Sequence, residues 1–197
     1  MQLGLTDRVV LIASDRAAER NACRDRLAQE GASVIVFERL SDAAGGVEQA
    51  VRECGRIDGV VICLPANDTA LLDASIDDLY ANWAAVECVA AAFRAALPIM
   101  TERGFGRLLS VVANSVKWLS DDADELGSIA GLGVLGMHKA AVADVARYGV
   151  SVNAIVRADA DDHAGVAATV AFLLSEHAGY MQGVTIALDG ATSPAVF

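Results

Sequence analysis

The fold is decided by the stretch RVVLIASDRAAERNACRDRLAQEGASVIVFER, residues 8–39. Its two ends, residues 8–13 and 33–39, are runs of β-branched and aliphatic residues that predict buried strands. The alanine-rich segment between them predicts an amphipathic helix that ends at Gly31. The inner positions expected for this helix are Ala22, Leu27 and Ala28. Two strands joined by a helix predict a parallel pair, because parallel neighbours need a crossover connection.

The same alternation continues to the end of the chain. Further strands are predicted at residues 58–65, 106–113, 149–156 and 183–190, and helices at residues 45–56, 77–104, 128–148 and 164–176. Asp77 is the expected N-cap of the first long helix. The alternation predicts a Rossmann-like α/β fold, a doubly wound parallel sheet with helices on both faces. No repeat or linker divides the sequence, so residues 1–197 are expected to form a single domain.

The charge of the chain excludes several classes of partner. Its formal net charge is -11, and Lys117 and Lys139 are its two lysines. A surface of this sign repels phosphate, so neither nucleic acid nor an anionic membrane is expected as a partner. The N-terminal segment reaches Asp7 without the apolar core of a signal peptide, and no apolar run is judged to approach membrane-spanning length. These features predict a cytoplasmic protein.

The cysteines indicate packing rather than disulfide or zinc chemistry. They are spread along the chain without a C-x-x-C pair, at Cys23, Cys54, Cys63 and Cys88. This distribution is typical of reduced thiols in the core of an intracellular protein.

Five successive blocks of the chain resemble the short-chain dehydrogenase/reductase family. They are GLTDRVVLIAS with LAQEGASVIVFER, GRIDGVVICLPAN, FRAALPIMTERGFGRLLSVVA, GVLGMHKAAVADVARYGVSVNAI and VAFLLSEHAGYMQGVTIALDG. The resemblance covers nearly the whole chain in the family's order. It implies a Rossmann fold and, in the family, an NAD(P)-dependent enzyme in which tyrosine, lysine, serine and asparagine move the proton and orient substrate and cofactor.

The cofactor-binding turn of the family is degenerate here. Its three glycines let the backbone approach the cofactor pyrophosphate at a helix N-terminus. In this sequence they fall on Ser14, Ala18 and Arg20. Arg20 stands in the tightest position, and Asp15 and Glu19 add negative charge beside it. Glu38 resembles the acidic residue that accepts the ribose hydroxyls, although a solvated residue at a strand end explains it equally well. No cofactor is therefore expected on this chain.

The catalytic positions of the family have also lost their chemistry. Alignment on VNAI, residues 152–155, places the family tyrosine on Gly127 and the lysine on Gly131. The serine position falls on Ala113 and the asparagine position on Ala85. No Tyr-x-x-x-Lys occurs in the sequence. A phenol beside an ammonium is what lowers the pKa of the phenol for acid-base work, so no catalysis is expected from this chain.

Three further departures from the family concern larger segments. The proline-glycine that follows VNAI in the family reads Arg157-Ala158 here. Residues 38–58 have room for one short helix, so an edge strand is expected to be missing. The segment RADADDHA, residues 157–164, is too short to build the substrate-closing lid of the family. A shortened sheet without a lid is therefore predicted.

The segment GLGVLG, residues 131–136, matches the G-x-G-x-x-G pattern of a dinucleotide-binding turn. It lies within a predicted helix instead of after a strand, which is the wrong context for that motif. Each glycine inside a helix costs up to about 1 kcal/mol relative to alanine. A cluster of glycines here therefore predicts close helix packing.

Other groups could in principle replace the missing catalytic pair. Ser115, His138 and Cys63 are the candidates for a divergent enzyme, although His138 is expected on a helix surface and Cys63 as a buried thiol. The acidic segments DDADE, residues 121–125, and DADDH, residues 159–163, are expected to be solvated loops, the second with an N-cap, and no metal site is predicted.

Two aromatic residues of the first long helix have an open assignment. Trp83 and Phe93 could form a ligand face, but the sequence favours core or subunit contact.

These observations lead to three hypotheses. The first is a catalytically silent subunit that assembles with an intact paralogue through residues 78–103 and 128–148 and the last helix and strand. The expected product is a hetero-oligomer, a tetramer, in which NAD(H) is held by the partner and the substrate is a hydroxyacyl-CoA or arylsuccinyl-CoA thioester. The second is a divergent, weak NAD(P)-dependent oxidoreductase. The third is a ligand or redox sensor that keeps the fold as a binding module.

Overall fold

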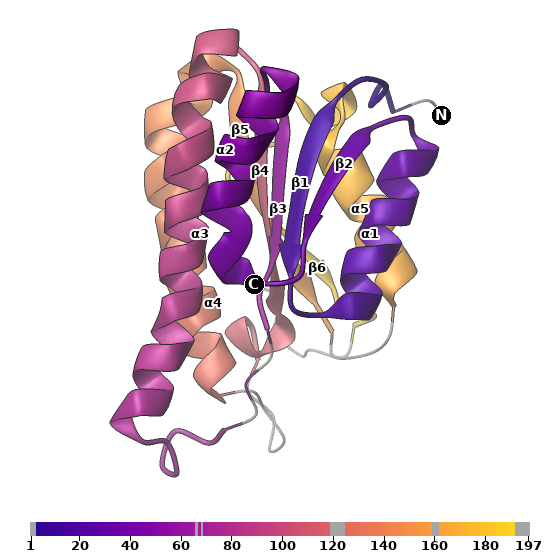
Figure 1. Cartoon of the computed structure of the whole chain (residues 1–197). Helices are drawn as coiled ribbons and strands as arrows, with labels where there is room; N and C mark the ends of the chain where they lie inside the picture. The colour runs from indigo at the N-terminus through magenta and orange to yellow at the C-terminus, as the bar shows by residue number, and fades with distance from the viewer. Residues whose placement is uncertain (1–2, 66, 68, 119–124, 159–161, 192–197) are drawn as a thin grey trace.

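The fold is built on one parallel sheet, shown in Figure 1. A computed structural model describes residues 3–65, 67, 69–118, 125–158 and 162–191. The strands are β1 (Val9–Ser14), β2 (Ser33–Phe37), β3 (Gly59–Cys63), β4 (Gly106–Ala113), β5 (Val150–Arg157) and β6 (Thr185–Leu188). Their spatial order is β2-β1-β3-β4-β5-β6, and all neighbouring pairs are parallel. The predicted doubly wound α/β fold is confirmed.

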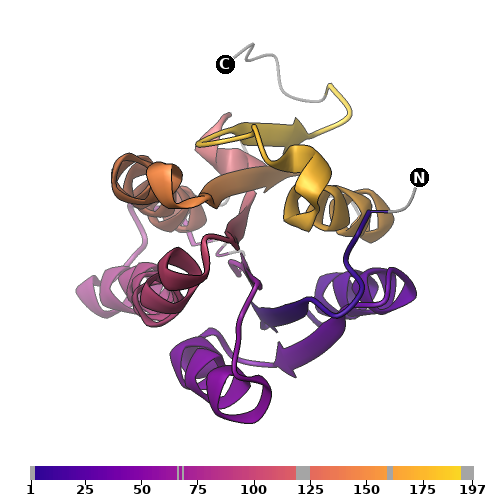
Figure 2. The same ribbon diagram turned by 90° about the horizontal axis from the view of Figure 1, so that it is seen from above.

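Five α-helices cover the two faces of this sheet, as the view along the strands in Figure 2 shows. They are α1 (Ala17–Gln29), α2 (Ala43–Cys54), α3 (Ile76–Arg103), α4 (Glu125–Val145) and α5 (His163–Leu174). Short 3-10 helices lie at η1 (Leu40–Asp42), η2 (Asn114–Val116), η3 (Ala146–Tyr148) and η4 (Glu176–Ala178). Helices α2, α3 and α4 pack on one face of the sheet, and α1 and α5 pack on the other.

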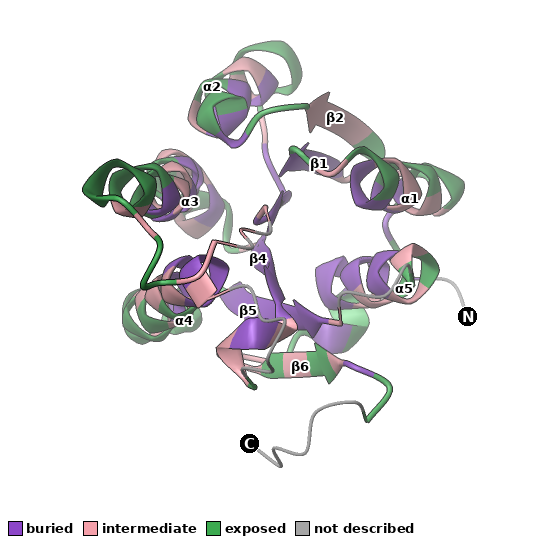
Figure 3. Ribbon diagram, turned by 90° about the horizontal axis from the view of Figure 1, so that it is seen from below, coloured by how far each residue is buried: buried purple, intermediate pink, exposed green. Residues whose placement is uncertain are grey.

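The central strands β1, β3, β4 and β5 are buried along their whole length because both of their faces are covered. Successive side chains of a strand point to opposite faces. Leu11 of β1 therefore packs in the core beneath α2 and α3, and its neighbour Ile12 packs in the core beneath α1 and α5. Figure 3 shows the buried sheet at the centre and the exposed outer sides of the helices around it.

The sheet ends at β2, as the short connection predicts. The chain leaves β2 through η1 and α2 and returns directly to β3, so no strand lies beyond β2 in the described part of the chain. The segment that is expected to be too short for a lid joins β5, which ends at Arg157, to α5, which begins at His163. Residues 159–161 of that connection lie outside the described ranges.

Helix α3 begins two residues earlier than the sequence suggests. Ser75, not Asp77, is its N-cap: the Ser75 hydroxyl accepts a hydrogen bond from the Asp78 amide at 3.1 Å, and the Asp78 carboxylate accepts one from the Ser75 amide at 2.9 Å. This reciprocal capping box satisfies two amides at once, which a lone Asp77 cap would not do. In α1, Ala28 is exposed and the expectation that it lies inside is wrong, whereas Leu27 is buried.

Two helices have membrane-spanning length and composition. Ile76–Arg103 and the segment Glu125–Tyr148 reach mean hydropathies of 1.5 and 1.3 over 18 residues. The expectation that no apolar run approaches this length is therefore wrong by that measure. In the structure both helices lie against the sheet, and Val89 and Ala92 of α3 and Val134 of α4 are fully buried, as in core helices of the fold.

The cysteines divide into different environments. Cys23 and Cys63 are buried, Cys88 is half-buried and Cys54 is exposed at the end of α2. The packing role predicted for all four is therefore wrong for Cys54, because it lies on the exposed side of α2.

Candidate functional site

The natural ligand crevice of this fold lies where β1 and β3 meet. The chain leaves β1 towards β2 on one side and returns to β3 on the other, and doubly wound sheets bind ligands beyond the carboxyl ends of strands at such a point. Ser14 ends β1 and pairs with Cys63 at the end of β3. Helix α1 starts three residues after Ser14, so its N-terminus borders the crevice.

Arg20 fills the first part of this crevice from within. It belongs to the first turns of α1 and is only 8% exposed. Its Nη1 donates a hydrogen bond to the Ser14 carbonyl oxygen at 2.8 Å, and its Nη2 donates one to Oε1 of Glu38 at 3.3 Å. The Glu38 side chain is otherwise largely exposed. The guanidinium thus joins the end of β1 to the segment that follows β2.

A second ion pair closes the crevice behind Arg20. Nε of Arg157, the last residue of β5, lies 2.7 Å from Oε2 of Glu19 in α1, and both side chains are almost fully buried. Arg157 also donates from Nη2 to the Leu64 carbonyl oxygen at 3.1 Å. Arg16 lies further away, with its Nε 4.0 Å from the same Glu19 oxygen. The contact ties the start of α1 to the ends of β3 and β5.

These residues do not fit a dinucleotide bound at the turn. A glycine-rich turn offers free amides and open space to a pyrophosphate. Here the Arg20 guanidinium donates hydrogen bonds to the Ser14 carbonyl oxygen and to Glu38, the residue that resembles the ribose acceptor of the family. A ligand on this turn would have to displace Arg20 and accept Glu19 as a neighbour.

The two thiols beneath the crevice are unreactive. Burial, and secondly the charge of Glu19, raise the pKa of Cys63 well above its ordinary value. The same two causes raise the pKa of Cys23 to about 12. A thiol attacks as the thiolate, so neither cysteine is a nucleophile at neutral pH.

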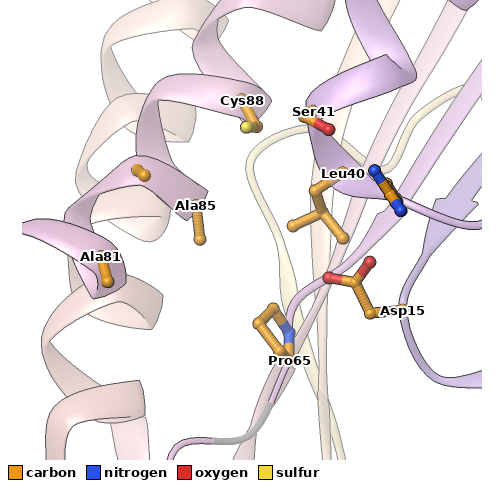
Figure 4. A pocket seen from close by; sticks show the side chains of 9 residues that line it. Asp15, Leu40, Ser41, Pro65, Ala81, Ala85 and Cys88 are labelled. Carbon is orange, nitrogen blue, oxygen red and sulfur yellow. The ribbon is translucent and has the colours of Figure 1, made fainter. Parts of the chain in front are cut away.

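A pocket of about 390 Å³ opens beside this crevice, between α3 and the segments that follow β1, β2 and β3 (Figure 4). Its apolar side is formed by Leu40, Pro65 and alanines of α3, and its polar groups are Asp15, Arg39 and Ser41. Cys88 lies at one end, and burial raises the pKa of this thiol. The pocket holds no nucleophile paired with a base.

The acidic segments hold no metal site in the part that the structure describes. Among the described residues, no group of three or more His, Cys, Asp or Glu side chains could hold a metal ion. Of the segment 159–163, Asp162 caps α5 by accepting a hydrogen bond from the Gly165 amide at 2.8 Å, as the N-cap interpretation predicts. Of the segment 121–125, Glu125 starts α4 and accepts one from the Leu71 amide. Residues 121–124 and 159–161 lie outside the described ranges.

The chain is similar in sequence or in fold to known dehydrogenases and reductases. No protein-family model matches the chain. A curated relative, the BbsC subunit of (2S)-[(R)-hydroxy(phenyl)methyl]succinyl-CoA dehydrogenase from Thauera aromatica, is 26% identical over 92% of this chain and 83% of its own. A double variant of the Serratia marcescens short-chain dehydrogenase/reductase superposes with a TM-score of 0.84 at 21% identity, over 94% of this chain and 97% of its own. YwfH, an NADPH-dependent reductase involved in bacilysin biosynthesis, gives 0.80 at 19%, over 94% and 99%.

The chain therefore has the fold of the short-chain dehydrogenases/reductases. Its sheet and helices superpose on these structures over 94% of its length.

The short-chain dehydrogenase/reductase positions on α4 face the sheet. Gly127 and Gly131, which align with the family tyrosine and lysine, are both buried. Val116 of η2 packs directly against Gly131, with Val112 of β4 behind it, so a side chain at Gly131 would collide with Val116. Ala113, the serine position, is buried at the end of β4. The position that the sequence alignment assigns to the family lysine is thus packed against a valine.

The remaining aligned position and the glycine cluster lie elsewhere. Ala85, the asparagine position, is half-buried on α3 and lines the pocket of Figure 4. Gly133 packs against Trp83 and Val86 of α3, the close helix approach that the glycine cluster predicts, whereas Gly136 faces open space. Trp83 remains half-exposed; Phe93, as the core interpretation requires, is buried.

His138 is buried, and its expected place on the helix surface is wrong. It lies seven residues, two helical turns, after Gly131 and so shares the face of α4 that packs on the sheet. Its Nε2 lies 3.0 Å from Oγ of Ser110 in β4, and its ring stacks on Phe93 at 5.5 Å between centroids. Burial lowers the pKa of His138 to about 4. The seven-residue spacing from Gly131 is the sequence signal from which the burial of His138 could have been predicted.

Ser115 does not form a catalytic pair in the described part of the chain. It lies in η2 and is nearly buried, and its Oγ makes no hydrogen bond with any described residue. His138 is engaged by Ser110 instead. A serine without a base beside it is a weak nucleophile.

Proposed function

We propose that this chain is a non-catalytic short-chain dehydrogenase/reductase subunit that supports an active paralogue in a hetero-oligomeric NAD-dependent alcohol dehydrogenase or ketoreductase. It binds no cofactor itself, and NAD(H) is held by the partner. The two chains associate through α3 and α4 and through α5 and β6, in a complex expected to be a tetramer of the cytoplasm.

The observation that carries this proposal is the packing of Val116 against Gly131. The family mechanism needs a lysine ammonium one helical turn from a phenol. At the aligned positions this chain has glycines, and its core has closed over the space. Arg20 and its contacts to Ser14 and Glu38 support the absence of a cofactor in the same way.

The outer sides of α3 and α4 support the assembly. Tyr80 is 69% exposed, Trp83 47% and Leu132 54%, although all three are large and apolar. Ala84 of α3 and Gly136 of α4 are small and also exposed, and residues of this size let another helix approach closely. Exposed apolar surface of this kind is typical of protein–protein contact. We call this surface the α3–α4 face.

The curated relative supports the partner and substrate class. By its name, that protein is one subunit of a dehydrogenase acting on a substituted succinyl-CoA. We extend this to the present chain as a substrate class, a hydroxyacyl-CoA or arylsuccinyl-CoA thioester, oxidised or reduced in the partner's active site.

Co-expression with an intact paralogue from the same genome tests the proposal. The expected result is a complex that elutes as one species and has NAD-dependent activity. A complex in which the tyrosine of the partner's Tyr-x-x-x-Lys motif is replaced by phenylalanine is expected to be inactive. The chain alone is expected to give no turnover with NAD(H) or NADP(H).

A matched pair of variants locates the contact. Leu132→Glu places a charge on the α3–α4 face and is expected to abolish the complex, whereas Ala28→Glu, an exposed position of α1 on the opposite side of the sheet, is expected to leave it intact. A chain that purifies as a self-sufficient monomer, indifferent to the paralogue, would overturn the proposal.

A further inference from the structure

We propose that Glu19, Arg20 and Arg157 form an intramolecular plug that closes the phosphate-binding turn of the cofactor crevice and stabilises the strand ends there without a bound dinucleotide. We call these three residues the crevice plug. The inference deepens the proposed function, since it rests on a crevice that takes no cofactor and identifies what occupies it instead.

The crevice plug links elements that are far apart in the sequence. Glu19 and Arg157 approach to 2.7 Å across 138 residues, and Arg157 reaches the Leu64 carbonyl after β3. Arg20 joins the Ser14 carbonyl to Glu38. The carboxyl ends of β1, β3 and β5 and the segment after β2 are therefore held together by side chains of α1 and β5.

The burial of the plug requires its charges to be paired. The Glu19 and Arg157 side chains are 0% and 3% exposed. Removing an isolated charge from water is so unfavourable that such groups occur in protein interiors only with a partner. Loss of either residue would leave the other as an uncompensated buried charge.

The plug also gives one physical reason for several separate departures from the family pattern. Arg20 replaces a family glycine, and Arg157 replaces the first residue of the family proline-glycine. Each replacement contacts a strand end directly: Arg20 donates to the Ser14 carbonyl oxygen, and Arg157 donates to the Leu64 carbonyl oxygen.

Cys63 supplies a built-in reporter of the closed crevice. It ends β3 beside Glu19 and is fully buried. Cys54, at the exposed end of α2, is an internal reference that a thiol reagent reaches freely. In the wild-type chain a maleimide is expected to label Cys54 at once and Cys63 at the slow rate of buried Cys23. Labelling of Cys63 as fast as Cys54, mapped by peptide mass spectrometry, would overturn the plug without any variant.

A double-mutant cycle tests the pairing itself. Glu19→Gln and Arg157→Met are each expected to lower the Tm by about 10 °C, from the loss of one partner of a buried pair, and to speed Cys63 labelling. The double variant is expected to lose clearly less than the sum, because it leaves no unpaired charge. Should the single variants not fold, recovery of folding in the double variant gives the same answer. Glu48→Gln, in the exposed pair with Arg52, is the control expected to change the Tm by less than about 2 °C.

The outcomes separate this inference from the proposed function. Additive losses in the cycle would overturn the plug but leave the partner complex untouched. Saturable binding of NADH to the wild-type chain would contradict both the plug and the cofactor-free role, whereas failure to form a complex with the paralogue contradicts the proposed function alone.

Discussion

Nε2 of His138 lies 3.0 Å from Oγ of Ser110, in the buried layer between α4 and β4. The imidazole is stacked on Phe93 and surrounded by core side chains, so it is neutral in the folded protein, and burial holds its pKa at about 4. The pair takes the place of a surface base that the sequence suggested and makes His138 part of the core.

The buried imidazole predicts a loss of stability in mild acid. In the unfolded chain His138 has its ordinary pKa of 6.5, above the folded value of about 4. The unfolded state therefore binds the extra proton between these values, and stability falls as the pH drops through this window, by at most about 1.4 kcal/mol per pH unit. Above pH 6.5 His138 is neutral in both the folded and the unfolded state, so its burial costs no stability through protonation.

Thermal unfolding at pH 7.5 and pH 5 checks this, with His138→Gln as the comparison. The variant lacks the titrating group, so its Tm is expected to fall less between the two pH values than that of the wild type. Equal losses in both proteins would show that other groups cause the acid sensitivity.

The packing of Gly131 predicts that alanine there destabilises the fold. A methyl group at this position collides with Val116, and overpacking a core costs about 1–3 kcal/mol. Gly136 in the same helix has nothing within 4 Å of such a methyl group, so Gly136→Ala is expected to stabilise the helix by up to about 1 kcal/mol. Urea unfolding of the two variants measures both effects. A tolerated Gly131→Ala would mean that the space for a side chain is still open.

The hydrogen bond from Arg20 to the Ser14 carbonyl predicts a cost for removing the guanidinium. Arg20→Met keeps the apolar stem but loses a bond from a charged donor, worth about 1.5–3 kcal/mol. Glu38→Gln tests the exposed end of the same contact and is expected to change stability by less than about 0.5 kcal/mol, since the Glu38 side chain is 82% exposed. Chemical denaturation is the measurement. Equal losses of stability in the two variants would mean that the stabilisation by Arg20 comes from its ion pair with Glu38 and not from its hydrogen bond to Ser14.

The capping box of α3 predicts different effects at neighbouring residues. Ser75→Ala removes the acceptor of the Asp78 amide and is expected to cost about 1 kcal/mol and to speed hydrogen exchange in the first turn of α3. Asp77→Ala, at the position that the sequence indicated as the cap, is expected to have the smaller effect. The reverse order would mean that the helix begins at the later residue in solution.

The sequence by itself determined the order of the elements and what the site lacks. Strand and helix periodicity are local signals, so β4 was predicted with its observed bounds, 106–113, and the other strands to within two residues. The absence of Tyr-x-x-x-Lys and the replacement of a glycine by Arg20 are facts of composition and spacing that no folding can alter. The predicted N-cap of α3 was wrong because two neighbouring residues can cap the helix, and Ser75 with Asp78 forms a better cap than Asp77.

Tertiary structure decided what fills the places that the sequence left empty. Val116 against Gly131, Ser110 against His138 and Glu19 against Arg157 are contacts between separate elements, and no local pattern encodes which side chains meet across a sheet. The physical reason is that burial and charge pairing depend on neighbours brought together by folding. From the sequence, Glu19 was interpreted only as a negative charge beside the degenerate cofactor turn. In the folded protein it pairs with Arg157, 138 residues away.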